Sequence, residues 1–136
     1  MAFIGSLEDR MAIRDLYGLY SDASARNNVT GWLDTWADDG HWESHIFDCT
    51  GKEELRKQHA TIMAMFDDLV FMSEVGAIEV DGDKATGRAT AREIGRLKNG
   101  KIFKLVGRYD DRLVRLNGRW LFAYRKYQPV VQEVEE

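Results

Sequence analysis

Residues 10–44 read RMAIRDLYGLYSDASARNNVTGWLDTWADDGHWES, and this stretch decides the fold. Its first half has apolar residues at three- and four-residue steps, which predicts an amphipathic helix with one face against the rest of the protein. Ser6, followed by acidic residues, is typical of a helix cap, so we expect this helix to cover residues 7–26.

A second, shorter helix and a first strand follow. Trp32 and Trp36 repeat the helical spacing, and we expect this helix to end at residues 38–40. Residues 41–47 are predicted to be extended, with Trp42 pointing inward. Two helices that lead directly into a strand indicate helices folded over one curved sheet.

Residues 48–51 are a predicted turn before a third helix. Thr50 and Glu53 have the spacing of a capping box, in which the threonine bonds forward and the glutamate reaches back. We expect this helix to run to about residue 66, with a buried face formed by Leu55, His59, Ile62, Met63 and Phe66.

The hydrophobic period then changes to two, which indicates β-strands. Hairpin signals separate four long strands, expected at residues 69–80, 84–97, 102–116 and 120–130. Residues 1–136 are therefore predicted to form a single α+β domain. We expect a cone-shaped, half-open barrel of a curved, mostly antiparallel sheet with three N-terminal helices over its concave face.

One strand of this sheet has an unusual face of small residues, namely Ala85, Gly87, Ala89 and Ala91. Such a face predicts either close packing of a helix or an open space inside the cone. The wide end of a cone is a natural pocket.

Composition limits the function. The 136 residues carry 19 Lys and Arg against 23 Asp and Glu, a formal net charge of −4, which argues against nucleic acid as a partner. One cysteine, Cys49, suits a reducing compartment. The sequence has no leader-like start and no apolar run of about 20 residues, so we expect a cytoplasmic protein that does not bind membranes.

Five motifs in this order are similar to the SnoaL-like family, of the superfamily named after nuclear transport factor two: AIRDLYGLYSDASA, WLDTWADDGHWE, GKEELRKQ, IEVDGDKATG and LNGRWLFAYRK. The resemblance covers residues 8–127. It is nearest to the family's cofactor-free dehydratases and dehydrochlorinases, among them scytalone dehydratase, lindane dehydrochlorinase and bile-acid dehydratase. It implies a cone-shaped fold with an internal pocket.

In those enzymes an aspartate late in the first helix orients a histidine on a strand, and the histidine takes a proton from carbon. The resemblance places Ala25 at the aspartate position, Phe71 at the histidine position and Tyr20 at a lysine position. It retains Arg125 on the last strand and Trp42 as a pocket tryptophan. The usual Asp/His dyad is absent, so any proton transfer must use other residues.

Glu93 is the first candidate, because it ends the inward-facing row of small residues that begins at Ala85. A carboxylate among apolar walls has a raised pKa, which favours proton transfer near neutral pH. The alternative is a structural ion pair at the rim of the cone, with Arg125 or Arg108.

His59 is the second candidate, because an imidazole on the covering helix can act as a base near neutral pH. The alternative is a packed core histidine. Tyr20, Tyr109, Tyr127 and Arg125 form a third group that can hold or polarise a carbonyl or a leaving oxygen. The alternative for each tyrosine is aromatic packing.

The prediction is a cofactor-free lyase or isomerase that abstracts a proton from a small apolar, cyclic or aromatic substrate. Its catalytic residues would be Glu93, His59, Arg125 and Tyr20, and its pocket would be lined by Trp42, Ile62, Phe66, Phe71, Leu105, Tyr109 and Tyr127. No cofactor is expected, and no metal either, since three histidines and one cysteine share no ligand spacing.

The partner expected is the small apolar molecule itself, and the resemblance implies a homodimer or homotrimer. Two alternatives stay open: a non-catalytic ligand-binding or assembly module of the same fold, and a small subunit of a larger oxygenase.

Overall fold

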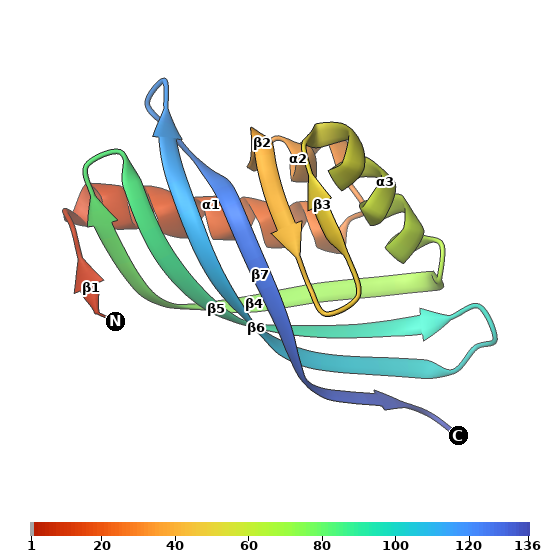
Figure 1. The fold of residues 1–136 in the computed structure, drawn as a ribbon. Helices are drawn as coiled ribbons and strands as arrows, with labels where there is room; N and C mark the ends of the chain where they lie inside the picture. The colour runs from red at the N-terminus through yellow and green to blue at the C-terminus, as the bar shows by residue number, and fades with distance from the viewer. Residues whose placement is uncertain (1) are drawn as a thin grey trace.

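The computed structural model describes residues 2–136, and Figure 1 shows them as a curved sheet with helices packed on one side. The helices are α1 (Leu7–Ala25), α2 (Val29–Leu33) and α3 (Lys52–Met63). The strands are β1 (Phe3–Ile4), β2 (Trp36–Glu43), β3 (Asp48–Thr50), β4 (Phe66–Asp81), β5 (Lys84–Leu97), β6 (Ile102–Leu116) and β7 (Arg119–Val134).

The strands form one sheet in the order β1-β4-β5-β6-β7-β2-β3. β1 pairs with β4 and β2 with β7 in parallel, and the other neighbours are antiparallel. The sheet stays open, with β1 and β3 as its edges, and α1 lies across the long strands (Figure 1). This arrangement confirms the predicted α+β cone. Within residues 2–136, no helix is both long and apolar enough to span a membrane.

The first helix forms as its sequence predicts. The Ser6 hydroxyl accepts a hydrogen bond from the backbone N–H of Asp9 at 3.0 Å and so caps α1. The face of α1 that packs on the sheet consists of Ile13, Leu16, Tyr17, Tyr20 and Ala23. Each large side chain buried in this way stabilises the fold by about 1.5–3 kcal/mol.

The small residues of β5 are a packing surface for this helix. Ala85, Gly87, Ala89 and Ala91 are buried, and the residues between them are exposed. A Cβ atom at Gly87 would lie 2.4 Å from the Tyr17 hydroxyl. Of the two roles predicted for this face, close packing of a helix or an open space, close packing of α1 is the one found at Gly87.

The prediction for the second helix and the first strand was wrong in its boundaries. α2 ends at Leu33, because the Thr35 hydroxyl bonds to the Trp32 carbonyl at 2.6 Å and the Thr35 carbonyl accepts the Phe122 N–H at 2.9 Å. Trp36 therefore belongs to β2, where it pairs with Phe122 of β7. Helical spacing on two tryptophans could not reveal a pairing with the last strand.

The segment after β2 also differs. A turn at residues 44–47 returns the chain as β3, where the sequence predicted a turn at 48–51. No capping box forms: Gly51 is the N-cap of α3, and the Glu54 side chain accepts the Thr50 N–H at 3.2 Å. α3 ends at Met63, so residue 66 belongs to β4.

The long strands agree closely with their predictions. β5 and β6 have the predicted bounds, while β4 begins earlier and β7 continues to Val134. The sequence did not predict β1, which pairs Phe3 with Ile78 along the edge of β4.

Candidate active site

A cavity of about 40 Å³ lies between the helices and the inner face of the sheet. Its walls come from α1, α2, α3, β2, β4, β5 and β6, and they consist of Tyr20, Ser24, Trp32, Trp42, His59, Ile62, Met63, Leu69, Phe71, Glu93 and Tyr109. This volume has room for a water molecule, whereas pockets that hold small ligands measure about 300–1,000 Å³. A ring-sized ligand therefore needs the walls to move.

Glu93 is the titratable carboxyl in this cavity. It faces inward from β5, between Phe71 on β4 and Leu105 on β6. Burial raises the pKa of its carboxyl from 4.5 to about 7. Among residues 2–136 no cation pairs with it, since Arg125 bonds to another carboxylate and Arg108 is exposed. The rim ion pair considered as an alternative is not formed.

His59 reaches the same cavity from α3. Its side chain is 7% exposed, and its ring lies 4.7 Å from the Trp32 ring. Burial lowers the pKa of the imidazole, so the neutral form dominates at pH 7. The structure thus brings Glu93 and His59, predicted from distant segments, to one cavity.

Aromatic rings make up most of the remaining wall. Tyr20 packs edge-on against Phe71, with ring centroids 5.6 Å apart. Trp32 packs edge-on against Trp42, with ring centroids 5.2 Å apart. Tyr109 lies next to Phe71 in the wall, with ring centroids 6.3 Å apart. Edge-to-face pairs of this kind hold their rings in fixed orientations. The cavity therefore has a largely aromatic wall with defined ring orientations.

Arg125 lies outside the cavity lining and is bound by the protein itself. Its guanidinium donates to both carboxylate oxygens of Asp111, at 2.8 and 3.1 Å, and both side chains are fully buried. Tyr17 donates to the same carboxylate at 2.5 Å. Burial is the largest single effect and acts to lower the pKa of Arg125, but Asp111 together with Tyr20, Tyr109 and Tyr17 outweighs it, so the pKa is raised. The direct substrate contact predicted for Arg125 is not available in this arrangement.

Three other residues predicted for the pocket lie beside it. Phe66, the first residue of β4, packs against Phe103 with ring centroids 5.4 Å apart. Leu105 is the cross-strand neighbour of Glu93, and Tyr127 pairs with Tyr109. None of the three is among the lining residues of the described cavity.

The sequence did not assign four lining residues to the pocket: Ser24, Trp32, Met63 and Leu69. Each belongs to an inward-facing helical or strand row that could be recognised from its period. The packing between these rows decides which of their residues line the same cavity. The spacing of residues along the sequence does not contain that information.

The positions that the resemblance assigned to the family dyad have no acid–base group. Ala25 is exposed at the end of α1, and the Phe71 ring lines the cavity. Among the residues described, no three His, Cys, Asp or Glu side chains converge in a way that could hold a metal. The titratable groups of the cavity are Glu93, His59 and tyrosines.

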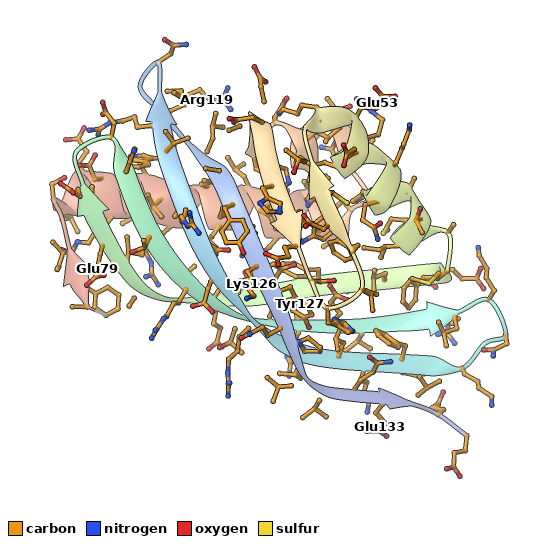
Figure 2. All side chains as sticks on the ribbon, viewed as in Figure 1. Glu53, Glu79, Arg119, Lys126, Tyr127 and Glu133 are labelled. Carbon is orange, nitrogen blue, oxygen red and sulfur yellow. The ribbon has the colours of Figure 1, made fainter. Side chains whose placement is uncertain are left out.

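Five buried side-chain atoms have no hydrogen-bond partner among residues 2–136: Nε of Arg10, Nε1 of Trp36, Nε1 of Trp42, Nη1 of Arg125 and the hydroxyl of Tyr127. Figure 2 labels Tyr127 on β7, where the long strands bend. Burial raises the pKa of Tyr127, and the charge of Glu93 raises it further.

A wider groove of about 930 Å³ lies elsewhere, at the hairpin ends of the sheet. Exposed side chains such as Ile4, Lys84, Thr86 and Leu116 line it. None of the lining residues is a buried titratable group. The smaller cavity around Glu93 is therefore the better candidate for chemistry.

These features define a cone-shaped α+β protein with an aromatic site enclosed between its helices and its sheet. The SnoaL-like domain family matches residues 5–126, and the chain belongs to the SnoaL-like family. The resemblance seen in the sequence motifs is confirmed.

Several solved structures share this fold. A hexachlorocyclohexane dehydrochlorinase, LinA-type3, from Novosphingobium barchaimii is 20% identical over 95% of this chain and 91% of that chain, with a TM-score of 0.85. A protein from Novosphingobium aromaticivorans, provisionally named a scytalone dehydratase, is 21% identical over 96% and 89%, with a TM-score of 0.86.

A protein of unknown function with a cystatin-like fold from Nostoc punctiforme is 22% identical over 96% of both chains, with a TM-score of 0.80. At these identities the likeness establishes the fold alone. Among curated proteins, none is similar enough in sequence to count as a match.

Proposed function

We propose that this protein is a cofactor-free lyase or isomerase that moves a proton on a small apolar, ring-containing molecule, with Glu93 as the group that carries the proton. The observation that supports the proposal is a carboxyl group without an ion-pair partner among residues 2–136, set in an aromatic cavity. The names of two similar structures, a dehydrochlorinase and a provisional dehydratase, support elimination chemistry.

Glu93 suits this role because its pKa of about 7 populates both the charged and the neutral form near neutral pH. The charged form accepts a proton from carbon, and the neutral form returns it. His59 is the second proton acceptor of the cavity, because its lowered pKa leaves a ring nitrogen free of its proton. The aromatic walls hold the substrate ring and exclude water.

Entry of a ring requires displacement of side chains on α3. Ile62 and Met63 are half-buried members of the cavity wall. Methionine has three rotatable bonds and fills irregular space without specifying one conformation. Met63 is therefore the wall residue that moves at least cost, and Met63→Ala should enlarge the cavity without removing a titratable group.

Proton exchange on carbon tests this proposal. The protein is incubated in D₂O with 1-indanone, a ring ketone, and the signal of the hydrogens beside the carbonyl is followed by proton NMR. General base catalysis contributes about 10²–10⁴-fold, so the wild type should exchange these hydrogens at least about tenfold faster than Glu93→Gln.

The matched control is Glu74→Gln, which removes an exposed carboxylate from β4. It should exchange as fast as the wild type. Equal rates for the wild type and Glu93→Gln would remove Glu93 from the chemistry.

A non-catalytic module of the same fold is the second candidate, and the volume of the cavity favours it. About 40 Å³ is too small for a ring in the arrangement described. If neither the wild type nor Met63→Ala binds 1-indanone, the walls do not open to a ring, and this second candidate is preferred as an assembly module.

For the partner, we propose that copies of this chain associate through the outer face of the sheet. Exposed apolar residues gather there across neighbouring strands, since Val70 pairs with Ile94, and Met72 and Val131 lie on the next row. Ile94→Arg should lower the mass measured by light scattering to that of a monomer. A wild-type protein that is already monomeric would contradict this.

A further inference from the structure

The groove at the hairpin ends of the sheet, called the outer groove below, has the size of a ligand site. Its volume is about 930 Å³, and small molecules occupy sites of about 300–1,000 Å³. The β4–β5 and β6–β7 hairpins lie at this same end of the sheet (Figure 1). Ile4 and Leu116, which are both exposed, are apolar parts of its wall. The proposed proton transfer at Glu93 uses none of these residues.

Arg112 supplies a guanidinium to the outer groove and has no protein acceptor for it. Among residues 2–136, no carboxylate forms an ion pair with Arg112. The guanidinium lies 4.7 Å from the centre of the Tyr124 ring, and Tyr124 in turn donates a hydrogen bond to Glu43. Stacking on a fixed ring orients the guanidinium and leaves its N–H donors free, and these donors match the two oxygens of a carboxylate.

Lys84 is a second cation of the outer groove, and it also lacks an ion-pair partner in the part of the chain that the structure describes. Lys84 on β5 pairs with Val114 on β6, and Thr86 pairs with Arg112. Lys84 and Arg112 are therefore diagonal neighbours on one face, a relation that places residues about 7–8 Å apart. Two like charges at this separation repel each other, and an anion bound between them removes the repulsion.

Three carboxylates, of Asp39, Glu79 and Asp81, also line the outer groove and limit the charge of its ligand. Figure 2 labels Glu79 beside β1, at the margin of the sheet. Because like charges repel, these groups disfavour a ligand with two negative charges more than a ligand with one. A single carboxylate fits the two cations better than a phosphate monoester does.

The apolar part of the outer groove continues from Arg112 along β6. Val114 and Leu116 follow Arg112 at two-residue steps, so their side chains lie on the same face of the strand. At about 3.4 Å per residue, the strand extends about 14 Å from Arg112 to Leu116. An aliphatic chain of medium length can lie over these side chains while its headgroup reaches Arg112.

We propose that the outer groove binds an aliphatic monocarboxylate of medium chain length. Arg112 and Lys84 hold the carboxylate, and Val114 and Leu116 contact the hydrocarbon chain. This binding site goes beyond the proposed function, because it is separate from the cavity around Glu93. It is also separate from the surface proposed for association of copies, since Ile94 lies near the other end of β5.

The test compares two probes of equal chain length, octanoate and 1-octanol, by isothermal titration with the full chain. The wild type should bind octanoate more tightly than 1-octanol. Arg112→Gln should weaken the binding of octanoate by about tenfold or more, because hydrogen bonds between charged groups are the stronger ones, and should leave 1-octanol unaffected. Leu116→Ser removes an exposed apolar side chain and should weaken the binding of both probes.

Arg108→Gln is the matched control, because Arg108 is exposed on the same face of β6 and does not line the outer groove. It should bind octanoate as the wild type does, and so should Glu93→Gln. The proposal is overturned if the wild type binds both probes equally or neither, or if Arg108→Gln and Arg112→Gln weaken octanoate binding alike.

NMR spectra of ¹⁵N-labelled protein locate the bound probe. Octanoate should shift the backbone signals of Arg112, Val114 and Leu116. Shifts confined to the indole signals of Trp32 and Trp42, which line the inner cavity, would place octanoate there and would also overturn the proposal. Loss of octanoate binding in Arg112→Gln with unchanged Glu93-dependent exchange of 1-indanone would confirm two independent sites.

Discussion

Replacement of Glu93 by glutamine should stabilise the protein, and the gain should depend on pH. Burial raises the pKa of the Glu93 carboxyl from 4.5 to about 7. Between these values the folded state binds more protons than the unfolded state, so the wild type loses stability as pH rises through this window. A shift of this size corresponds to roughly 3 kcal/mol when the carboxyl is fully ionised. Glutamine has nearly the same shape and no charge, and it avoids this cost.

Urea unfolding at pH 5 and pH 8 measures the effect on the wild type, Glu93→Gln and Glu74→Gln. The gain in the free energy of unfolding for Glu93→Gln should be roughly 1 kcal/mol or less at pH 5 and roughly 3 kcal/mol at pH 8. Glu74 is exposed on β4, so its substitution should change little at either pH. A gain for Glu93→Gln that is the same at both pH values would refute the reasoning, because it would mean that the carboxyl is not desolvated.

Three further outcomes are expected. Asp111→Ala leaves the buried charge of Arg125 without its partner and should lower the free energy of unfolding by about 3–5 kcal/mol; a loss below about 1 kcal/mol in urea titrations would contradict this role of the pair. Gly107→Ala places a Cβ atom 2.2 Å from the Tyr127 hydroxyl and should lower the free energy of unfolding by about 1–3 kcal/mol. Gly18→Ala meets nothing within 4 Å and should raise the free energy of unfolding by up to about 1 kcal/mol. Equal effects of the two substitutions would show that the Tyr127 ring can move aside freely. The His59 imidazole should titrate below 6.5 by NMR, because burial penalises its cation, and a midpoint at or above 6.5 would show that the ring is solvated.

The long strands could be predicted from the sequence because their signals are local. Alternation from Ala85 to Glu93 specifies which side chains of β5 face inward, and the same period holds in the structure. The same alternation predicts that Glu93 faces inward, and Glu93 lines the cavity in the structure. The helix cap at Ser6 is local for the same reason.

Other features depend on contacts between distant segments. Trp36 has helical spacing from Trp32, but its pairing with Phe122 places it in a strand. Arg125 was expected to meet the substrate, and its binding to Asp111 depends on the register between β6 and β7. Such pairings come from the assembled sheet, and no local pattern encodes them.

The pKa of the Glu93 carboxyl is the quantity on which the proposed chemistry depends most directly. It can be measured by NMR titration of the side-chain carboxyl carbon in protein labelled with ¹³C at glutamate, with Glu93→Gln to assign the signal. A midpoint of about 7 is the result expected for a desolvated carboxyl in the aromatic cavity. A midpoint near the ordinary 4.5 would contradict it, because Glu93 would then be a solvated carboxylate with no special capacity to transfer protons.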